Sequence, residues 1–292
     1  MQLLRSIVFV PGNRSNMLER ALGFSADIIM VDLEDSVPPG EKAAACELAT
    51  EWVPRLAGAG KQVMVRVNSL DTGLAAGELS AVVSPDLAGI SIGKGNTAWD
   101  LQQVDQLLAP LESKAGLETG SIKVIPWIET AMAIVHVYEM ARASRRIVGI
   151  AFGGEDYTND MGVTRSDFGE ECYFARSSVA VAARAAGVAG LDGPFVGFRD
   201  PEGLRTDAGA ARRMGYTGKF AIHPAQIDII NETFSPDPED VAYARRVVEA
   251  WDEAEAAGRG SLSIDGRMVD VPVVKRAQNL LALASAIEAQ TC

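Results

Sequence analysis

Two carboxylate residues end neighbouring apolar runs in the middle of the chain. Glu129 closes the run at 123–129 (KVIPWIE), and Asp156 follows the run at 146–152 (RIVGIAF). The stretch between them has about the length of a strand plus a crossover helix, so neighbouring parallel strands would bring both acids to one edge of a sheet. Converging carboxylates need positive charge to offset their desolvation, and Mg²⁺ prefers a few carboxylates together with water and substrate oxygens. The sequence therefore predicts a Mg²⁺ site, with Mn²⁺ as a substitute; the alternative is two unrelated loop acids, such as helix N-caps.

A second group of acids follows the apolar run at 27–33. Asp32, Glu34 and Asp35 form the tetrapeptide DLED directly after IIMV. Strand alternation puts Asp32 and Glu34 on one side and Asp35 on the other. Exposed acids are usually only solvated, but acids that follow a buried run are poorly placed to reach open water. We expect them near the metal.

Basic residues and a histidine end other runs. Arg66 shares a strand face with Met64, and a guanidinium at a strand end could hold a carboxylate or an enolate oxygen through two hydrogen bonds. The alternative for Arg66 is a structural ion pair with the DLED acids. Lys94 ends GISIGK and His223 ends KFAIH; both are candidates by position alone, and a lone histidine is more often structural.

The first apolar run leads into FVPGNR (9–14). Pro11 and Gly12 turn the chain there, and the backbone amides that open the next helix could face an anion, with Arg14 and Arg20 nearby. The alternative is a plain turn with solvated arginines.

The composition excludes several classes of protein. The chain has 292 residues, with 27 Lys and Arg against 39 Asp and Glu and a net charge of -12, which argues against nonspecific binding to nucleic acid or anionic membranes. Apolar runs are too short to span a membrane and the first residues lack a signal-peptide core, so we expect a cytoplasmic protein. The three cysteines lack C-x-x-C spacing and predict neither disulfides nor a zinc site. Motifs for serine hydrolases, zinc proteases, P-loops and dinucleotide binding are also absent, which leaves metal-assisted chemistry on an oxygen-rich substrate.

Eight short apolar runs alternate with helix-like segments. Their hydrophobicity is continuous, which is typical of parallel strands covered on both sides. We expect strands at 6–10, 27–33, 62–68, 89–94, 123–129, 146–152, 192–198 and 219–223. We expect helices at 14–24, 40–57, 98–115, 130–143, 170–187, 203–215 and 224–232, with the weakest pattern at 70–84. Eight strands predict an α/β fold of the (β/α)8 TIM-barrel type, whose active site lies at the C-terminal ends of the strands; a doubly wound open sheet is the alternative.

The eightfold pattern ends near SPDPED (235–240), where two prolines break the chain. Helical spacing follows from Val241 to Ala254, SLSIDGRMVDV then predicts a hairpin, and 274–287 a final helix. We therefore expect a barrel domain at 1–234 and a C-terminal helix–hairpin–helix extension at 235–292.

Eight ordered motifs span essentially the whole chain. They are RSIVFVPGNR, VDLEDSV followed by Lys42, RVNS, IPWIETAMA, FGGEDYTNDMG, LDGPFVGFRDPEGL, GKFAIHPAQI and GRMVDVPV. Together they resemble the citrate lyase β-subunit-like family of CoA-ester lyases in the HpcH/HpaI aldolase superfamily, which includes citramalyl-CoA lyase, malyl-CoA lyase and malyl-CoA thioesterase. The resemblance implies a Mg²⁺-dependent TIM barrel that assembles as a homotrimer or as an assembly of trimers. It also implies that the C-terminal extension closes a neighbouring subunit's active site.

The resemblance also implies roles for individual residues. Glu129 and Asp156 would bind Mg²⁺, and Arg66 would hold the reacting oxygen. Asp270 would exchange a proton with the acetyl carbon; the alternative for Asp270 is a turn or capping acid. The residues implied to support the metal's water molecules are Asp32, Glu34 and Asp35. The residues implied to contact the CoA ester are Phe9, Arg14, Arg20 and Lys42 around the adenine and phosphates, and Glu155, Ile222 and His223 around the rest of the substrate.

The predicted reaction is a retro-Claisen cleavage of a 3-hydroxyacyl thioester. (S)-Citramalyl-CoA or malyl-CoA would give acetyl-CoA and pyruvate or glyoxylate. The stretch DGPFVGFRDPEG favours this branch of the family, and Gly93 stands where citrate lyase β subunits have a proline. The alternatives are a malyl-CoA thioesterase, a citrate lyase β subunit acting on citryl-CoA, and a non-catalytic CoA-binding subunit.

Overall fold

The computed structural model of the chain describes residues 3–166, 169–256 and 261–291. Contacts within the chain separate two compact units. One unit is Leu4–Thr233, and the other begins at Phe234 and includes Leu3.

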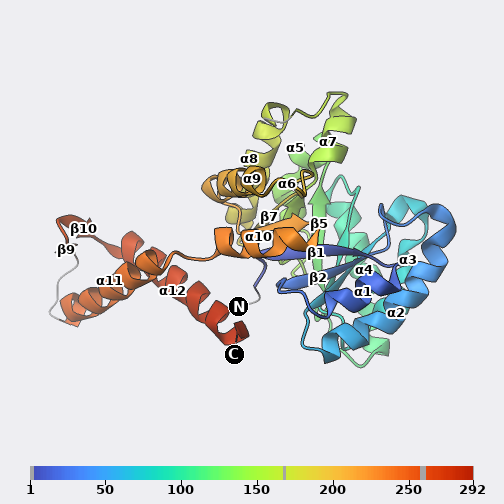
Figure 1. Cartoon of the computed structure of the whole chain (residues 1–292), viewed down its shortest axis with the longest axis horizontal. Coiled ribbons are helices and arrows are strands. Elements are labelled where there is room, and N and C mark those ends of the chain that lie inside the picture. Colours follow the sequence, from blue (N-terminus) through green and yellow to red (C-terminus); the bar gives the residue numbers. More distant parts are fainter. Residues whose placement is uncertain (1–2, 167–168, 257–260, 292) are drawn as a thin grey trace. The chain divides into compact units, whose positions relative to one another are not determined.

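Eight parallel strands form a closed barrel in the first unit (Figure 1). The strands are β1 (Ser6–Pro11), β2 (Ile28–Asp32), β3 (Val63–Val67), β4 (Gly89–Ile92), β5 (Lys123–Ile128), β6 (Gly149–Phe152), β7 (Ala189–Asp192) and β8 (Gly218–Ala221). Each strand pairs with the next in sequence, and β8 pairs with β1. The predicted TIM barrel is confirmed, and the open doubly wound sheet is excluded because a closed barrel has no edge strand.

Helices surround the barrel. They are α1 (Ser15–Ala21), α2 (Lys42–Gly58), α3 (Ala75–Val82), α4 (Ala98–Lys114), α5 (Ala131–Val135), α6 (Val137–Ala141), α7 (Gly154–Met161), α8 (Tyr173–Ala186), α9 (Pro201–Met214) and α10 (Ile227–Phe234). The stretch 70–84, where the sequence pattern is weakest, contains a short 3-10 turn and α3. The predicted single helix at 130–143 is wrong, because the backbone at His136 leaves helical geometry and separates α5 from α6.

The seventh strand lies earlier in the sequence than predicted. β7 covers Ala189–Asp192, whereas the segment 193–198 is the loop that follows it. The prediction of a strand at 192–198 is therefore wrong. Pro194 has no N–H to donate to a sheet. Of the three large apolar residues in this loop, Phe195 packs its ring against Gly197 and Gly203, whereas Val196 and Phe198 are exposed.

The barrel interior is filled by alternate residues of the strands. Its buried cluster comprises Leu4, Ile7, Ile28, Met30, Met64, Ile125, Trp127, Ala151, Leu191 and Phe220. Three aromatic rings close the upper part of this cluster: Phe9 stacks on Trp127 at 5.9 Å and on Phe220 at 5.1 Å between centroids. The next inward residue of each strand must therefore lie at the barrel's mouth.

A buried ionic cluster joins β7 and β8 to the helices outside them. Lys219 is 1% exposed, and its ammonium bonds to Asp192, to Asp207 Oδ2 at 2.6 Å and to the Gly193 carbonyl at 2.6 Å. Arg176 donates to Asp192 at 2.8 and 2.6 Å and to Asp207 at 2.8 Å. Two cations thus neutralise two carboxylates beneath the loop that follows β7.

The C-terminal unit has the predicted order of helix, hairpin and helix. α11 (Pro238–Ala256) precedes the antiparallel strands β9 (Leu262–Ile264) and β10 (Arg267–Val269), and α12 (Val271–Thr291) follows. Asp265 and Gly266 both have positive φ, at 50° and 76°, which is the type I′ turn that suits a two-residue hairpin loop. The unit has its own buried cluster of Ala244, Val247, Trp251, Val269, Val274 and Ala277.

In the part of the chain that the structure describes, the helices are too short or too polar to cross a membrane.

We expect Lys219→Met to destabilise the barrel strongly. Removing one cation leaves the buried Asp192 and the partly buried Asp207 facing a single arginine, and breaking a buried ion pair typically costs about 3–5 kcal/mol. Urea unfolding would measure this loss. The matched control is Lys114→Met at an exposed position of α4, which should change stability by less than about 0.5 kcal/mol. An unfolding free energy of the Lys219 variant equal to that of the wild type would contradict the role of the cluster.

Candidate active site

Three charged residues form the layer directly above the barrel core. Asp32 follows Met30 on the inward face of β2, Arg66 follows Met64 on β3, and Glu129 follows Trp127 at the end of β5. The period of two in a strand dictates these positions. Asp32 and Arg66 are direct register partners, so the sheet itself sets them side by side.

Arg66 binds Asp32 through two hydrogen bonds. Its Nε donates to Oδ1 at 2.7 Å and its Nη2 to Oδ2 at 2.6 Å. Burial alone would raise the pKa of Asp32, but the hydrogen bond and charge of Arg66 outweigh it and hold that pKa below its usual value. Burial likewise opposes the charged form of Arg66, yet Asp32 raises the pKa of the guanidinium. The structural ion pair considered for Arg66 in the sequence is therefore present, and it fixes both side chains.

The DLED turn is organised around this pair. Asp32 also accepts the backbone N–H groups of Glu34 at 2.9 Å and Ser36 at 3.2 Å. Arg66 Nη1 lies 3.1 Å from Glu34 and 3.3 Å from Asp35. Asp32 and Glu34 are buried, as expected for acids that follow a buried run, but the Asp35 side chain is 51% exposed and reaches solvent.

Two lysines hold the same turn from neighbouring elements. Lys42, at the start of α2, donates to the carbonyls of Leu33 at 2.8 Å and Glu34 at 2.6 Å. Lys94, which follows β4, places its ammonium 3.2 Å from Glu34 Oε1 and 3.3 Å from Asp35. Lys42 therefore supports the turn directly, and its predicted contact with CoA remains a prediction.

Glu129 is buried among other carboxylates. Its Oε1 accepts the backbone N–H of Lys94 at 2.7 Å. Burial, together with the charges of Asp156 and Glu34, raises the pKa of Glu129 to about 8. Burial, with the charge of Asp35, also raises the pKa of Glu34. The Glu129 carboxylate therefore lies in a site with excess negative charge.

Two glycines make room for this carboxylate. A Cβ at Gly93 would lie 2.6 Å from Glu129 Oε1, and a Cβ at Gly153 would lie 2.6 Å from Oε2. Lys94 adopts a left-handed φ of 60°, which is a costly backbone conformation for a residue with a side chain. In this conformation its backbone N–H donates to Glu129. Lys94 was a candidate by its position in the sequence alone. The flanking Gly93 and Gly95 are the signal that could have identified its backbone role.

Asp156 lies in the first turn of α7, and neither acid caps a helix. Gly153 is the N-cap of α7 and Thr130 is the N-cap of α5, where its side chain accepts the N–H of Ala133. The alternative that Glu129 and Asp156 are N-caps is therefore wrong. Glu155, next to Asp156, is exposed and pairs with Arg165 at 3.0 Å.

The donor set fits a hard divalent cation. Glu129 and Asp156 interact electrostatically as like charges, and both offer the carboxylate oxygens that Mg²⁺ prefers. Among residues 3–166, 169–256 and 261–291, no group of three or more His, Cys, Asp or Glu is arranged to hold a metal. An ion here would complete its shell with water and substrate oxygens, as Mg²⁺ commonly does.

Phe9 is partly buried at the end of the barrel core. Its ring packs against Trp127 and Phe220, and the Arg66 guanidinium lies 4.4 Å from its centroid. Arg14 and Arg20 are exposed on and next to α1. The contacts of Phe9, Arg14 and Arg20 with CoA remain predictions.

The remaining candidates lie elsewhere. Ile222 and His223 are exposed directly after β8. Asp270 belongs to the C-terminal unit, where its Oδ1 accepts the N–H of Val273 at 3.3 Å and its carbonyl accepts the N–H of Val274 at 3.1 Å. Asp270 thus caps the start of α12, which is the alternative that its sequence position suggested.

The chain matches proteins of one family over almost its whole length. The model of the HpcH/HpaI aldolase/citrate lyase family matches residues 5–224. Citrate lyase subunit beta of Leuconostoc mesenteroides subsp. cremoris is 37% identical over 98% of this chain and 94% of its own length. The L-malyl-CoA/beta-methylmalyl-CoA lyase of Cereibacter sphaeroides is 34% identical over 98% of this chain and 96% of its own length.

A solved structure agrees with these relatives. CitE from Mycobacterium tuberculosis, in complex with magnesium, acetoacetate and coenzyme A, is 29% identical and superposes with a TM-score of 0.76 over 97% of this chain and 98% of that chain. Sequence and structure thus lead to the same group of CoA-ester lyases. The chain belongs to the HpcH/HpaI aldolase/citrate lyase family.

Proposed function

We propose that this chain is a Mg²⁺-dependent carbon–carbon lyase that cleaves a 3-hydroxy-3-carboxyacyl thioester of coenzyme A. The substrate is (S)-citramalyl-CoA or malyl-CoA, and the products are acetyl-CoA and pyruvate or glyoxylate. The observation that carries the proposal is the pair of carboxylates, Glu129 and Asp156, beside the guanidinium of Arg66 at the barrel's mouth. The malyl-CoA lyase and the magnesium- and coenzyme A-bound CitE among the similar proteins support it.

The carboxylates define where a metal would act. Glu129 and Asp156 would hold Mg²⁺, which when bound supplies Lewis-acid stabilisation of negative charge on a substrate oxygen. Glu34, buried beside Glu129, has its Oε1 3.2 Å from the Lys94 ammonium. This ion pair holds the Glu34 carboxylate next to the proposed metal ligands, which supports the role expected for the DLED acids.

The protein's own groups account for the other charges of the reaction. The carbinol hydroxyl gives its proton to water and becomes the ketone oxygen of the 2-oxo acid, while the electrons of the broken carbon–carbon bond remain on the α-carbon of the thioester, which then takes up one proton. Arg66 stabilises the negative charge of the resulting enolate, because its Nη1 makes only the longer contacts to Glu34 and Asp35 and can exchange them for a substrate oxygen. Asp270 of a neighbouring subunit in a trimer delivers the proton to the α-carbon.

A second candidate is cleavage of citryl-CoA, because one similar protein is a citrate lyase subunit beta. The three candidate substrates differ in the group on the carbinol carbon, which is hydrogen in malyl-CoA, methyl in citramalyl-CoA and carboxymethyl in citryl-CoA. The methyl group is worth only about 1–3 kcal/mol of discrimination in a pocket, so a direct comparison of substrates is required.

Purified protein should cleave citramalyl-CoA or malyl-CoA in the presence of Mg²⁺ and release a 2-oxo acid together with acetyl-CoA. The assay follows 2-oxo acid and free thiol in one sample, with citryl-CoA in parallel. Asp156→Asn, which keeps the volume and removes the charge, should lose at least about a hundredfold in kcat because the cation loses one of two anionic ligands. Free thiol without a 2-oxo acid would identify a thioesterase, and inactivity with all three esters would support a non-catalytic CoA-binding protein.

The metal-free protein should become less stable as pH rises from about 5 to 8. Glu129 has a raised pKa of about 8 in the folded state, so between its ordinary pKa and 8 the folded chain binds a proton that the unfolded chain has lost. Stability then falls with pH by about 1.4 kcal/mol per unit for one such group. Thermal unfolding at several pH values measures the slope, and Glu129→Gln should flatten it.

Mg²⁺ should reverse this trend. A proton on Glu129 competes with the cation, so added Mg²⁺ should raise the unfolding temperature more at pH 8 than at pH 6. An equal metal effect at both pH values would contradict the assignment of Glu129 as a ligand.

Asp270→Asn should abolish proton exchange without destabilising the C-terminal unit. Asparagine caps helices as well as aspartate does, so the cap on α12 persists while the acid is lost. Exchange of the acetyl-CoA methyl protons with D₂O, followed by NMR, should fall at least about a hundredfold. If Asp270 acts across a subunit boundary, co-expression of the inactive Asp156→Asn and Asp270→Asn chains should restore activity, whereas a lack of restored activity would contradict the shared site.

A further inference from the structure

The two proposed metal ligands follow β5 and β6 after the pairing of these strands ends. The register pairs Ile128 with Phe152, and the N–H of Gly153 donates to the Ile128 carbonyl at 3.1 Å. Glu129 and Asp156 both lie beyond this point, one directly after β5 and the other in the first turn of α7. Strand pairing therefore does not by itself fix one ligand relative to the other.

A side chain of α7 connects the two segments. Asp160 Oδ2 accepts the backbone N–H of Ala131 at 2.7 Å. Ala131 is the first residue of α5 and lies two residues after Glu129, whereas Asp160 lies four residues after Asp156 in α7. Positions i and i+4 of a helix lie on the same side, about one turn apart. One turn of α7 thus carries a proposed metal ligand and the carboxylate that holds the chain next to the other ligand.

The residues that follow β5 are also held from the side of β4. Lys94 donates its backbone N–H to Glu129 at 2.7 Å, and Thr130 Oγ1 donates to Asn96 Oδ1 at 2.5 Å. Both partners belong to the loop between β4 and α4. The short segment after β5 therefore has partners on both flanks, and Asp160 is the partner that α7 supplies.

We propose that Asp160 is a positioning residue that sets the spacing of the two metal ligands through its hydrogen bond to Ala131. The inference rests on the proposed function, since it assumes that Glu129 and Asp156 bind a divalent cation. Groups that orient metal ligands without touching the metal typically change the metal affinity about ten- to a hundredfold when they are removed. Asp160 is exposed, so its substitution should affect the metal site much more than the stability of the barrel.

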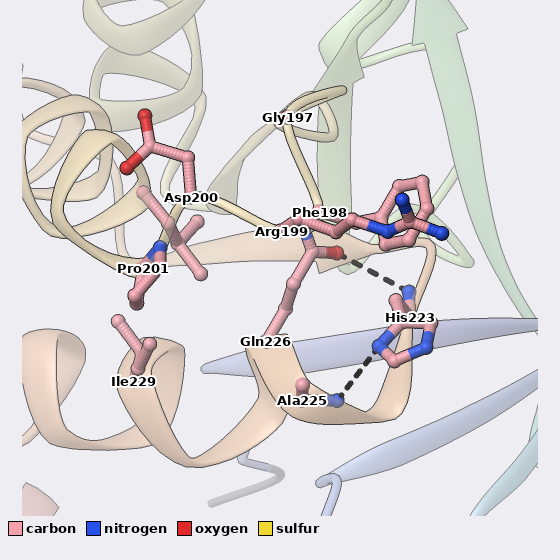
Figure 2. A pocket seen from close by; sticks show the side chains of 10 residues that line it. Gly197, Phe198, Arg199, Asp200, Pro201, His223, Ala225, Gln226 and Ile229 are labelled. Atoms are coloured by element: carbon pink, nitrogen blue, oxygen red, sulfur yellow. Dashed lines mark hydrogen bonds between the residues drawn. The ribbon is translucent and has the colours of Figure 1, made fainter.

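This link lies apart from the pocket of about 490 Å³ among the loops after β7 and β8 (Figure 2). Phe198, His223 and Gln226 line that pocket, and none of its lining residues belongs to α5 or α7. Substitutions in the link should therefore leave the pocket unchanged. Metal binding can then be measured independently of any effect on this part of the mouth.

Two substitutions remove the hydrogen bond from opposite sides. Asp160→Ala removes the acceptor. Ala131→Pro removes the N–H, and proline is favoured at the first position of a helix; the extended backbone of Thr130, with φ −134° and ψ 159°, also suits the residue before a proline. Each variant should raise the Kd for Mn²⁺ about tenfold, measured by EPR of the free ion in the absence of substrate. At saturating Mg²⁺, kcat should stay within about threefold of the wild type.

A further variant separates position from charge. Asp160→Asn keeps an acceptor oxygen and removes the negative charge, so its Kd for Mn²⁺ should stay within about threefold of the wild type. The double variant Ala131→Pro/Asp160→Ala should lose no more affinity than either single variant, because both substitutions remove the same bond. Asn159→Ala, at the neighbouring exposed position of α7, is the matched control and should leave the Kd unchanged.

The outcomes separate this inference from the proposed function. Wild-type protein that binds no Mn²⁺ would overturn both. Wild-type binding with an unchanged Kd in folded Asp160→Ala and Ala131→Pro would overturn the inference alone, and so would equal losses in Asp160→Asn and Asp160→Ala, which would indicate an effect of charge. A loss of kcat at saturating Mg²⁺ with an unchanged Kd would also overturn it. The expected Kd values without cleavage of any ester would support the inference and overturn the proposed lyase.

Discussion

The mouth of this barrel depends on the ion pair between Asp32 and Arg66. Parallel pairing of β2 and β3 sets the two residues directly opposite each other, one layer above a core of apolar side chains, where neither charge is stable alone. Their two hydrogen bonds satisfy both groups. The DLED turn then folds over the pair, with Lys42 holding its carbonyls and Lys94 reaching its carboxylates from the end of β4.

This arrangement leaves an imbalance of charge on the neighbouring strands. The cations of the mouth are committed to the DLED acids, whereas Glu129 receives a backbone N–H and lies near Asp156 and Glu34. Gly93 and Gly153 keep the space beside its carboxylate free of side chains. Burial and like charges make the ionised form of Glu129 unfavourable. A bound divalent cation would stabilise that form, because it offsets both the repulsion between the carboxylates and the cost of their desolvation.

A second cluster of buried charges supports the part of the barrel formed by β7 and β8. Beneath β7 and β8, Lys219 and Arg176 neutralise Asp192 and Asp207 in a buried cluster, which anchors the loop that carries Phe198. The cluster contacts none of the metal-binding candidates, yet it fixes the point from which the β7–α9 loop leaves the barrel. The charged residues of the mouth and the loop that follows β7 are thus supported by separate sets of buried ion pairs.

Hydrophobic pattern and strand periodicity determined much of this protein without a structure. Continuous apolar runs predicted the parallel barrel. The alternation of side chains along each strand predicted that Asp32, Arg66 and Glu129 would lie at its mouth. Both patterns can be read from the sequence because they depend only on neighbouring residues in the chain. Only the tertiary structure decided the position of β7, since the apolar segment 193–198 is a loop in which Phe195 packs against Gly197 and Gly203 while Val196 and Phe198 are exposed. It also decided the partners of Arg66 and the backbone role of Lys94. These depend on contacts between segments far apart in the chain, and sequence periodicity carries no information about such contacts.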